Sequence, residues 1–276
     1  MNTAKDNRQP FCRPFLPLGL VILLLCRVLV GPVPESHAGG NGLSVPDTLN
    51  CAKPLFRLTP KQLSISLWAD KMVPSRVGNK APRQNSHDLD TLYGEAALAD
   101  QNLKQVTRQV AASTGGTAVF PPGGGLKDRK RAEEKIEVEL GGDASLLMDI
   151  SRSSIEYDTI DQVYQALQFI LQHGYEVVRL KDRALAPLPS GFWDIHLNLR
   201  MPNGHIVELQ LHLRKIRRYS ISEGHRYYVR IREIKSRAFR ENRALTPDER
   251  SIIDRLNCEQ RRFYETMFKQ GRKGSK

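Results

Sequence analysis

The chain has 276 residues, of which 42 are Lys or Arg and 30 are Asp or Glu, so its formal net charge at pH 7 is +12. This length accommodates one domain with appendages or two modest domains, and so basic a surface attracts polyanions such as nucleotides, RNA or anionic lipid, with solubility alone as the competing explanation. The four cysteines lack the paired spacing of metal ligands, which excludes a structural zinc domain.

Residues 1–38 have the pattern of a secretory signal peptide. Arg8 and Arg13 precede an apolar run at 16–30, and small residues precede a cleavage site before Gly39. The run is shorter than the roughly 20 apolar residues of a membrane span, and an uncleaved membrane anchor is the alternative. Removal of 1–38 takes away four basic and two acidic residues, so the charge of +12 falls by 2 to about +10. We therefore expect export, either to a periplasm or by secretion.

Residues 39–86 are expected to form a flexible arm, because Pro, Gly, Ser and Asn are scattered through them with little periodicity. Only 63–68 has the pattern of local order. Two cysteines remain after loss of the signal peptide, Cys51 in this arm and Cys258 near the C-terminus. In an exported protein they either pair, which ties the arm to the last helix, or stay as two lone thiols.

Beyond the arm, helical and strand patterns alternate. Apolar spacing of three and four residues predicts helices at 87–114, 127–140, 161–173, 223–240 and 246–267. Apolar or alternating runs predict strands at 146–150, 177–180, 193–200 and 205–213. Asn203-Gly204 between the last two strands predicts a hairpin. This order predicts an α+β fold in which helices flank a mixed central β-sheet, with one domain at 87–240 followed by a basic helix and tail at 241–276.

The strand at 205–213 alternates in polarity, which gives it two different faces. Glu208, Gln210 and His212 share one face, and Leu209 and Leu211 lie on the other. One face is therefore core, and the opposite face is a candidate working surface.

Two carboxylates, Asp149 and Glu208, are candidate ligands of a hard cation such as Mg²⁺. Asp149 stands among apolar residues at the end of the strand expected at 146–150, where a carboxylate without a partner is costly to desolvate. The two acids either bind the cation or pair with Arg and Lys, and Arg152 is the nearest such partner of Asp149.

A dense cationic segment precedes Asp149 and contains Lys127, Arg129, Arg131 and Lys135. Lys127, Arg131 and Lys135 fall on one helix face, where they repel one another unless they meet polyphosphate oxygens or nearby glutamates. A solvated helix face is the alternative. Phe192 offers an aromatic plane for a nucleobase, or it is ordinary core.

Several common catalytic motifs are absent from the sequence. It contains no Gly-x-Ser-x-Gly nucleophile elbow, no GxxxxGK phosphate loop and no dinucleotide-binding glycine fingerprint. With these motifs absent, the carboxylates, the cations and the aromatic ring described above favour a site for a metal ion, a phosphate chain and a nucleobase.

In order and spacing, these residues resemble the RelA/SpoT alarmone-synthetase domain over about residues 87–235. The matching pieces are the basic segment 127–135, Asp149, Lys181-Asp182, Gly191-Phe192 with His196, Glu208 with Gln210, and His225 with Tyr228. Members of this family transfer pyrophosphate from ATP to the 3′-hydroxyl of a guanine nucleotide. The resemblance therefore implies a nucleotidyltransferase-like fold and a nucleotide pyrophosphokinase activity that depends on Mg²⁺.

The resemblance also implies a role for each matching residue. Asp149 and Glu208 would hold Mg²⁺, and Glu208 would also help to deprotonate the attacking hydroxyl. The phosphates of ATP would be bound by Lys127, Arg129, Arg131, Lys135, Arg152 and Lys181. The acceptor, a guanine or adenine nucleotide, would be bound by Phe192, His196, Gln210 and His225.

Two positions depart from the family pattern. Ser154 stands where the family commonly has an arginine, with Arg152 two residues earlier, and Phe192 replaces a stacking tyrosine. The sequence looks more like the divergent branch found in phage genomes and secreted toxins, which implies use as a toxin or effector and an immunity protein as partner.

Two alternatives remain open: a non-catalytic module that binds nucleotides or RNA on the same fold, and transfer to tRNA 3′ ends. The basic C-terminal helix with Arg250, Arg255, Arg261 and Arg262 suits a polyanion such as tRNA, and a solvated face explains it equally.

Overall fold

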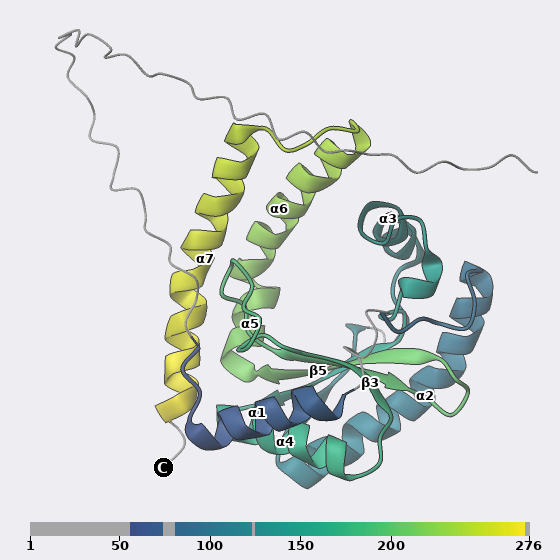
Figure 1. The fold of residues 1–276 in the computed structure, drawn as a ribbon, viewed down its shortest axis with the longest axis vertical. Coiled ribbons are helices and arrows are strands. Elements are labelled where there is room, and N and C mark those ends of the chain that lie inside the picture. Colours follow the sequence, from purple (N-terminus) through teal and green to yellow (C-terminus); the bar gives the residue numbers. More distant parts are fainter. Residues whose placement is uncertain (1–55, 74–80, 123–124, 274–276) are drawn as a thin grey trace, which may run out of the picture. The chain divides into compact units, whose positions relative to one another are not determined.

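The computed structural model describes residues 56–73, 81–122 and 125–273 (Figure 1). The described residues fall within one compact unit that starts at residue 47. The expected signal peptide and Cys51 lie outside the described residues. Of the helices in these three ranges, none has the length and apolarity that a bilayer span requires.

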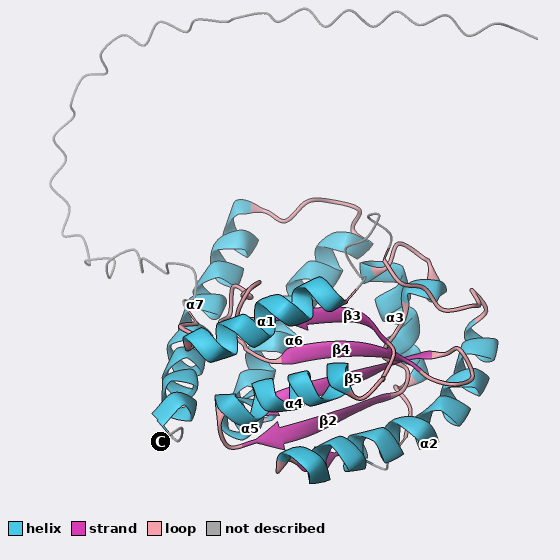
Figure 2. Cartoon of the chain, turned by 60° about the horizontal axis from the view of Figure 1, so that its bottom comes forward, coloured by secondary structure: helices cyan, strands magenta, loops and turns pink. Residues whose placement is uncertain are grey.

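A five-stranded mixed sheet forms the centre of this unit, and it confirms the predicted α+β class (Figure 2). The strands are β1 (Thr117–Val119), β2 (Arg152–Tyr157), β3 (Val177–Asp182), β4 (Ile195–Arg200) and β5 (Ile206–Leu213). Their order across the sheet is β1-β2-β5-β4-β3. The β2/β5 pair is parallel and the other three pairs are antiparallel, so residues distant in the chain become neighbours across the sheet.

Seven helices surround the sheet in the described residues. They are α1 (Pro60–Met72), α2 (Leu89–Thr114), α3 (Arg129–Glu139), α4 (Ile160–Gln172), α5 (Arg214–Ile221), α6 (Glu223–Arg240) and α7 (Pro247–Lys273). Figure 1 shows α1, α2 and α4 beneath the sheet, whereas α3 and α6 rise on the opposite side. The predicted helices are confirmed, apart from differences at their ends, whereas α1, which lies in the expected arm, and the short helix α5 were not predicted.

The two faces of β5 differ as its alternation predicted. Leu209 and Leu211 are fully buried in the main core, together with Ile195 and Leu197 of β4. Glu208 is only partly buried on the other face. Because neighbouring strands are in register, this division into an apolar and a polar face extends across the sheet.

The hairpin between β4 and β5 forms at the predicted turn. Gly204 has a φ of 84°, a left-handed conformation that glycine adopts without steric cost. The amide of Met201 donates to the carbonyl of His205 at 2.9 Å, which closes the turn. The turn fixes the register that places Gln210 opposite His196.

The strand predicted at 146–150 is wrong. A 3-10 turn at Ala144–Leu146 and a loop occupy this region, and the strand β2 begins only at Arg152. Leu147 and Ile150 are fully buried in a small second core with residues of α2 and α3. The apolar run thus reflects packing of a loop, and Asp149 lies in that loop.

The arm predicted at 39–86 is ordered where α1 lies. Thr59 and Gln62 form a capping box around Pro60 at the first helical position. Ser66 Oγ donates to Asp182 Oδ2 at 2.5 Å, which ties α1 to β3. The scattered polar residues around α1 concealed a helix whose stability comes from this docking.

The segment predicted as a separate C-terminal part, 241–276, is also integrated. α7 contributes Tyr264 and Phe268 to the main core. Cys258 on α7 is disulfide-bonded, with its partner outside the described residues. This observation favours the paired alternative over lone thiols for Cys258.

The anchoring of α1 gives a stability prediction. Ser66→Ala removes a donor from the buried carboxylate of Asp182, so we expect the free energy of unfolding to fall by about 1–3 kcal/mol in urea denaturation. Ser64→Ala is the matched control, because Ser64 is exposed on the same helix and should change stability by less than about 0.5 kcal/mol. Equal effects of the two substitutions would contradict an anchoring role for Ser66.

Candidate functional site

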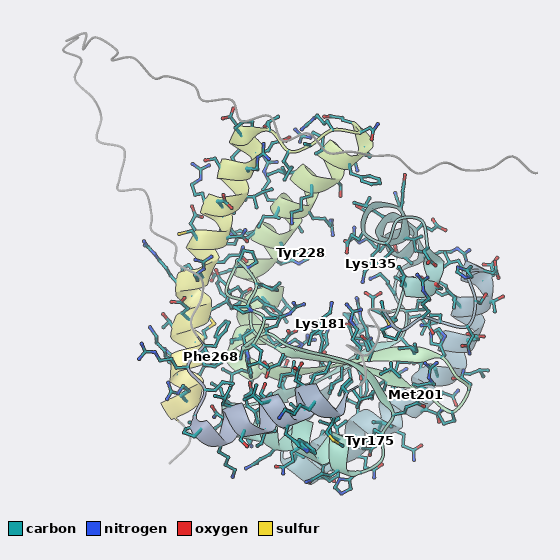
Figure 3. All side chains as sticks on the ribbon, viewed as in Figure 1. Lys135, Tyr175, Lys181, Met201, Tyr228 and Phe268 are labelled. Carbon is teal, nitrogen blue, oxygen red and sulfur yellow. The ribbon has the colours of Figure 1, made fainter. Side chains whose placement is uncertain are left out.

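A cavity of about 420 Å³ lies between the polar face of the sheet, α3 and α6. The sheet contributes Arg152, His196, Glu208 and Gln210, and the loop before β2 contributes Asp149. The wall at α3 includes Lys127, Arg131 and Lys135, and the wall at α6 consists of His225, Tyr228, Arg232 and Ser236. In Figure 3, Lys135 extends from α3, Tyr228 from α6 and Lys181 from the sheet. The cavity thus joins most of the residues that the sequence singled out.

Strand register brings the residues on the floor of the cavity together. Arg152 of β2 lies opposite Glu208 of β5 in the parallel pair. Gln210 lies opposite His196 of β4 in the antiparallel pair. Because opposite residues point to the same face, all four side chains reach the cavity side of the sheet.

Asp149 is buried between two lysines. Its Oδ2 accepts hydrogen bonds from Lys127 Nζ at 2.8 Å and Lys135 Nζ at 2.9 Å. Burial alone raises the pKa of Asp149, but the two ammonium groups outweigh it and hold the pKa below its usual value. Burial lowers the pKa of Lys127, whereas Asp149 and Glu208 outweigh burial at Lys135 and raise its pKa. Asp149 is therefore a carboxylate near neutral pH.

The carboxylates fit a hard cation such as Mg²⁺. Asp149 Oδ1 is buried and has no hydrogen-bond partner among the described residues, and Glu208 lines the same cavity. The described residues contain no cluster of three or more His, Cys, Asp or Glu side chains that encloses a metal. Mg²⁺ commonly takes one or two carboxylates and completes its shell with water and substrate phosphates. Asp149 and Glu208 would hold it in this way.

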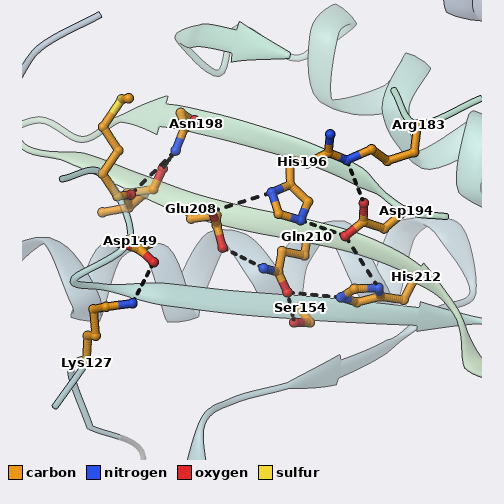
Figure 4. Close-up of polar contacts among 12 residues, drawn as sticks. Lys127, Asp149, Ser154, Arg183, Asp194, His196, Asn198, Glu208, Gln210 and His212 are labelled. Atoms are coloured by element: carbon orange, nitrogen blue, oxygen red, sulfur yellow. Dashed lines mark hydrogen bonds and ion pairs between the residues drawn. The ribbon is translucent and has the colours of Figure 1, made fainter. Parts of the chain in front are cut away.

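Glu208 lies in a network of polar contacts (Figure 4). Gln210 Nε2 donates to Glu208 Oε1 at 2.5 Å, and His196 Nδ1 lies 3.5 Å from Glu208 Oε2. Nε2 of the same histidine lies 2.6 Å from Oδ2 of Asp194. Burial disfavours protonation of His196, but the two carboxylates outweigh it and raise its pKa. No role was predicted for Asp194, although its spacing of two residues from His196 indicates that both lie on one face.

The residues of α6 in the cavity form a stripe. His225, Tyr228, Arg232 and Ser236 follow one another at helical spacings of three and four residues. Among them, only His225 was assigned a role from the sequence, although the spacing itself would have indicated the others. The guanidinium of Arg232 lies 5.7 Å from the ring centre of Tyr228, and this tyrosine is 54% exposed. An exposed aromatic ring beside a cation is suited to stacking on a nucleobase.

Arg129, which was expected at the phosphates of ATP, is not among the residues that line the cavity. Its guanidinium pairs with Asp90 at 2.5 Å and with Glu133 at 3.2 Å. It also lies over the ring of Tyr93, so it faces α2. Arg129 is two residues from both Lys127 and Arg131, so on a helix its side chain points about 200° away from their shared face, which explains the difference.

Phe192 and Lys181 also lie outside the lining of this cavity. The Phe192 ring packs edge-on against Tyr264 at 5.5 Å, which favours the core interpretation over the stacking one. Lys181 lies on β3, opposite His196 in register and two residues from both Arg179 and Arg183. Arg179 and Lys181 share one face of β3, Arg183 follows the end of the strand, and these cations extend the positive surface beyond the cavity.

No protein-family model matches the chain, and a search of curated proteins gives no match. Among solved structures, the type VI effector Tas1, in complex with its immunity protein, aligns at 19% identity and a TM-score of 0.48, over 66% of this chain and 96% of the effector. Small alarmone synthetase 1 from Bacillus subtilis aligns at 14% identity and a TM-score of 0.42, over 65% and 94% of the two chains. A GTP pyrophosphokinase family protein from Streptococcus pneumoniae aligns at 14% identity and a TM-score of 0.44, over 65% and 96%. These neighbours are alarmone synthetases and a secretion-system effector.

Lys181 gives a prediction for the pH dependence of anion binding. Burial, together with Arg179 and Arg183, lowers the pKa of Lys181 to about 8. Below this pH the amine is charged and attracts phosphate, and above it the charge is lost. We therefore expect the affinity for tripolyphosphate, measured by titration calorimetry, to fall by up to roughly tenfold per pH unit between about pH 8 and pH 10.

Lys181→Arg is the matched control, because arginine stays charged over this range. Other titrating groups are common to both proteins and cancel in the comparison. The same pH dependence in both proteins would show that Lys181 does not titrate in this range or does not contribute to anion binding.

Proposed function

We propose that this protein is a nucleotide pyrophosphokinase, which transfers the β,γ-pyrophosphate of ATP to the 3′-hydroxyl of a purine nucleotide in the presence of Mg²⁺. The observation that carries the proposal is the cavity, where Asp149 and Glu208 from distant parts of the chain face a wall of cationic side chains. Such a combination of two acids and several cations suits a polyphosphate with its metal.

The donor polyphosphate would lie against the cations of α3 and β2. Lys127, Arg131, Lys135 and Arg152 line the cavity and would neutralise its charge. A bound Mg²⁺ would supply further neutralisation of the phosphate oxygens from its place at Asp149 and Glu208. Lys127 and Lys135 share Oδ2 of Asp149, which leaves Oδ1 for the metal.

The chemical step is a displacement at the β-phosphorus of ATP. The acceptor 3′-oxygen forms a bond to this phosphorus, the bond from it to the oxygen that bridges the α- and β-phosphates breaks, and AMP leaves with that oxygen. The proton of the hydroxyl passes to the carboxylate of Glu208. The protein contributes mainly the position of the reactants and the neutralisation of charge.

The acceptor would lie on the side of the cavity formed by β4, β5 and α6. His196, Gln210 and His225 line this side and offer hydrogen bonds to a ribose or a phosphate. Tyr228 offers a stacking surface there, in place of the ring expected at Phe192. Guanine and adenine nucleotides and the 3′ end of tRNA are all acceptors of the required chemistry.

We further propose that the protein is exported and acts as a toxin or effector. The signal-peptide pattern of residues 1–38 supports export, and so does the disulfide at Cys258, since disulfides persist in oxidising compartments. ATP is scarce outside the cytosol, so the enzyme would act after delivery into another cell. A cell that produces such an enzyme needs a neutralising immunity protein as partner.

A non-catalytic binding module is the second candidate. The observation in its favour is that Lys127 and Lys135 already pair with Asp149, while Ser154 donates to Gln210 and supplies no positive charge. In that case affinity for nucleotides follows salt concentration and does not require Mg²⁺.

Glu208→Gln distinguishes the two functions. We expect wild-type protein with Mg²⁺ and labelled ATP to transfer label to at least one of GDP, GTP, ADP or tRNA, resolved by thin-layer chromatography or on gels. Glu208→Gln should lose at least about 100-fold in rate, because it removes the proton acceptor and a metal ligand, with its circular-dichroism spectrum unchanged.

Glu176→Gln is the control, since Glu176 has a 62% exposed side chain and pairs with Arg200 outside the cavity. It should retain the wild-type rate. Transfer to none of the four acceptors, with ATP binding that is insensitive to Mg²⁺, would reject the enzyme and favour the binding module.

A further inference from the structure

Asp194 is a buried acid that the proposed reaction does not use directly. It is fully buried, immediately precedes β4, and is not among the residues that line the cavity. Its Oδ2 lies 2.6 Å from His196 Nε2, and its Oδ1 lies 3.7 Å from Arg183 Nε. Placing a carboxylate in such an environment is costly, and an apolar side chain would fill the space at lower cost. A contribution to stability is therefore a poor explanation for an acid at this position.

Two chains of contacts lead from Asp194 to the two oxygens of Glu208 (Figure 4). The first passes through His196, whose Nδ1 lies 3.5 Å from Glu208 Oε2. The second passes through His212 and Gln210. His212 Nδ1 lies 3.9 Å from Asp194 Oδ2, and Nε2 of the same ring lies 3.0 Å from Gln210 Oε1. Gln210 Nε2 in turn donates to Glu208 Oε1 at 2.5 Å. The 3.9 Å between His212 and Asp194 exceeds hydrogen-bonding distance, and His212 Nδ1 has no hydrogen-bond partner among the described residues, so the connection from Asp194 to Glu208 runs through His196.

Asp182, a buried acid at the end of β3, shows a different pattern. Asp182 accepts hydrogen bonds from Ser66 Oγ, from Tyr164 OH at 2.7 Å and from the amide of Ala184 at 2.8 Å. All of these partners lie on the side of α1 and α4 or in the adjacent turn, and none lines the cavity. Asp182 joins structural elements, whereas the partners of Asp194 lead to the cavity.

We infer that Asp194 is a positioning residue, which holds the imidazole of His196 in one orientation and through it fixes Glu208 toward the acceptor hydroxyl. The inference rests on the proposed function, because Glu208 is there the proton acceptor. A histidine whose Nε2 faces a buried carboxylate presents Nδ1 to the opposite side, and here that side is Glu208 and the cavity. Carboxylates that orient a metal-binding histidine in this way change activity by roughly 10- to 100-fold, and we expect an effect of the same order here.

A double-mutant cycle tests the inference. Asp194→Asn keeps the size of the side chain and removes its charge, and we expect kcat to fall by roughly 10- to 100-fold. In the His196→Ala background the same substitution should change the rate by less than about twofold, because Asp194 acts through the missing ring. Rate losses that multiply in the double variant would overturn the inference, as would an unchanged kcat in folded Asp194→Asn.

Asp182→Asn is the matched control for loss of a buried carboxylate. We expect a lower melting temperature with an unchanged kcat for the folded protein, since the contacts of Asp182 do not reach the cavity. A fall in kcat as large as that of Asp194→Asn would show that any buried charge has this effect and would overturn the inference.

A measurement on the wild-type protein needs neither a folded variant nor turnover. Nitrogen-15 NMR of the histidine side chains should show Nε2 of His196 protonated, with a proton that exchanges slowly with water. A deprotonated Nε2, or rapid averaging between the two tautomers, would reject the role of Asp194. The proposed function fails in a different way: no acceptor receives label, although His196 keeps a single tautomer and orientation.

Discussion

Alternation of side chains along five strands is the constraint on which the rest of the structure depends. The apolar half of β5 packs into the main core, so Glu208 and Gln210 have to point to the opposite face. A shift of register by one residue would bury both polar groups and expose Leu209 and Leu211, at a cost that fixes the register. Core packing therefore sets the position of the candidate catalytic residues without any contact between them and the core.

Electrostatics then determines what the polar face can bind. Cations from α3, β2 and β3 converge on one region, and only a few acids offset them. At Asp149 the negative charge is neutralised by direct contact, because two lysines share one of its carboxylate oxygens. At Lys181 the adjacent charges have the same sign, and burial beside Arg179 and Arg183 lowers the pKa of its amine to about 8. A bound polyanion would relieve this repulsion.

Five of the seven described helices and the hairpin could be predicted from the sequence because their signals are local: caps, apolar spacing and the Asn203-Gly204 turn. The strand β2 was missed because two consecutive serines and Glu156 hide its alternation, while the apolar run before it fills a second core as a loop. The spacing of Lys127, Arg131 and Lys135 predicted one shared face, and all three line the cavity. Arg129 lies outside the lining because it is two residues from Lys127 and Arg131, and Phe192 lies outside it because its packing against Tyr264 depends on the path of α7. Their binding roles stay predictions.

Position 154, where the resemblance led us to expect an arginine, is a serine, and the alternation of side chains along β2 offers a geometric explanation. Positions 152 and 154 lie on one face of β2, so an arginine at either position reaches the polar side of the sheet. Arg152 lies opposite Glu208 and lines the cavity, whereas Ser154 lies opposite Gln210 and donates to its Oε1 at 3.2 Å. Compared with the arginine that the family resemblance led us to expect at 154, the positive charge of Arg152 lies two residues, roughly 7 Å, nearer the loop that carries Asp149. The hydroxyl at 154 takes up one contact of Gln210 instead, and it thereby belongs to the network that holds Glu208.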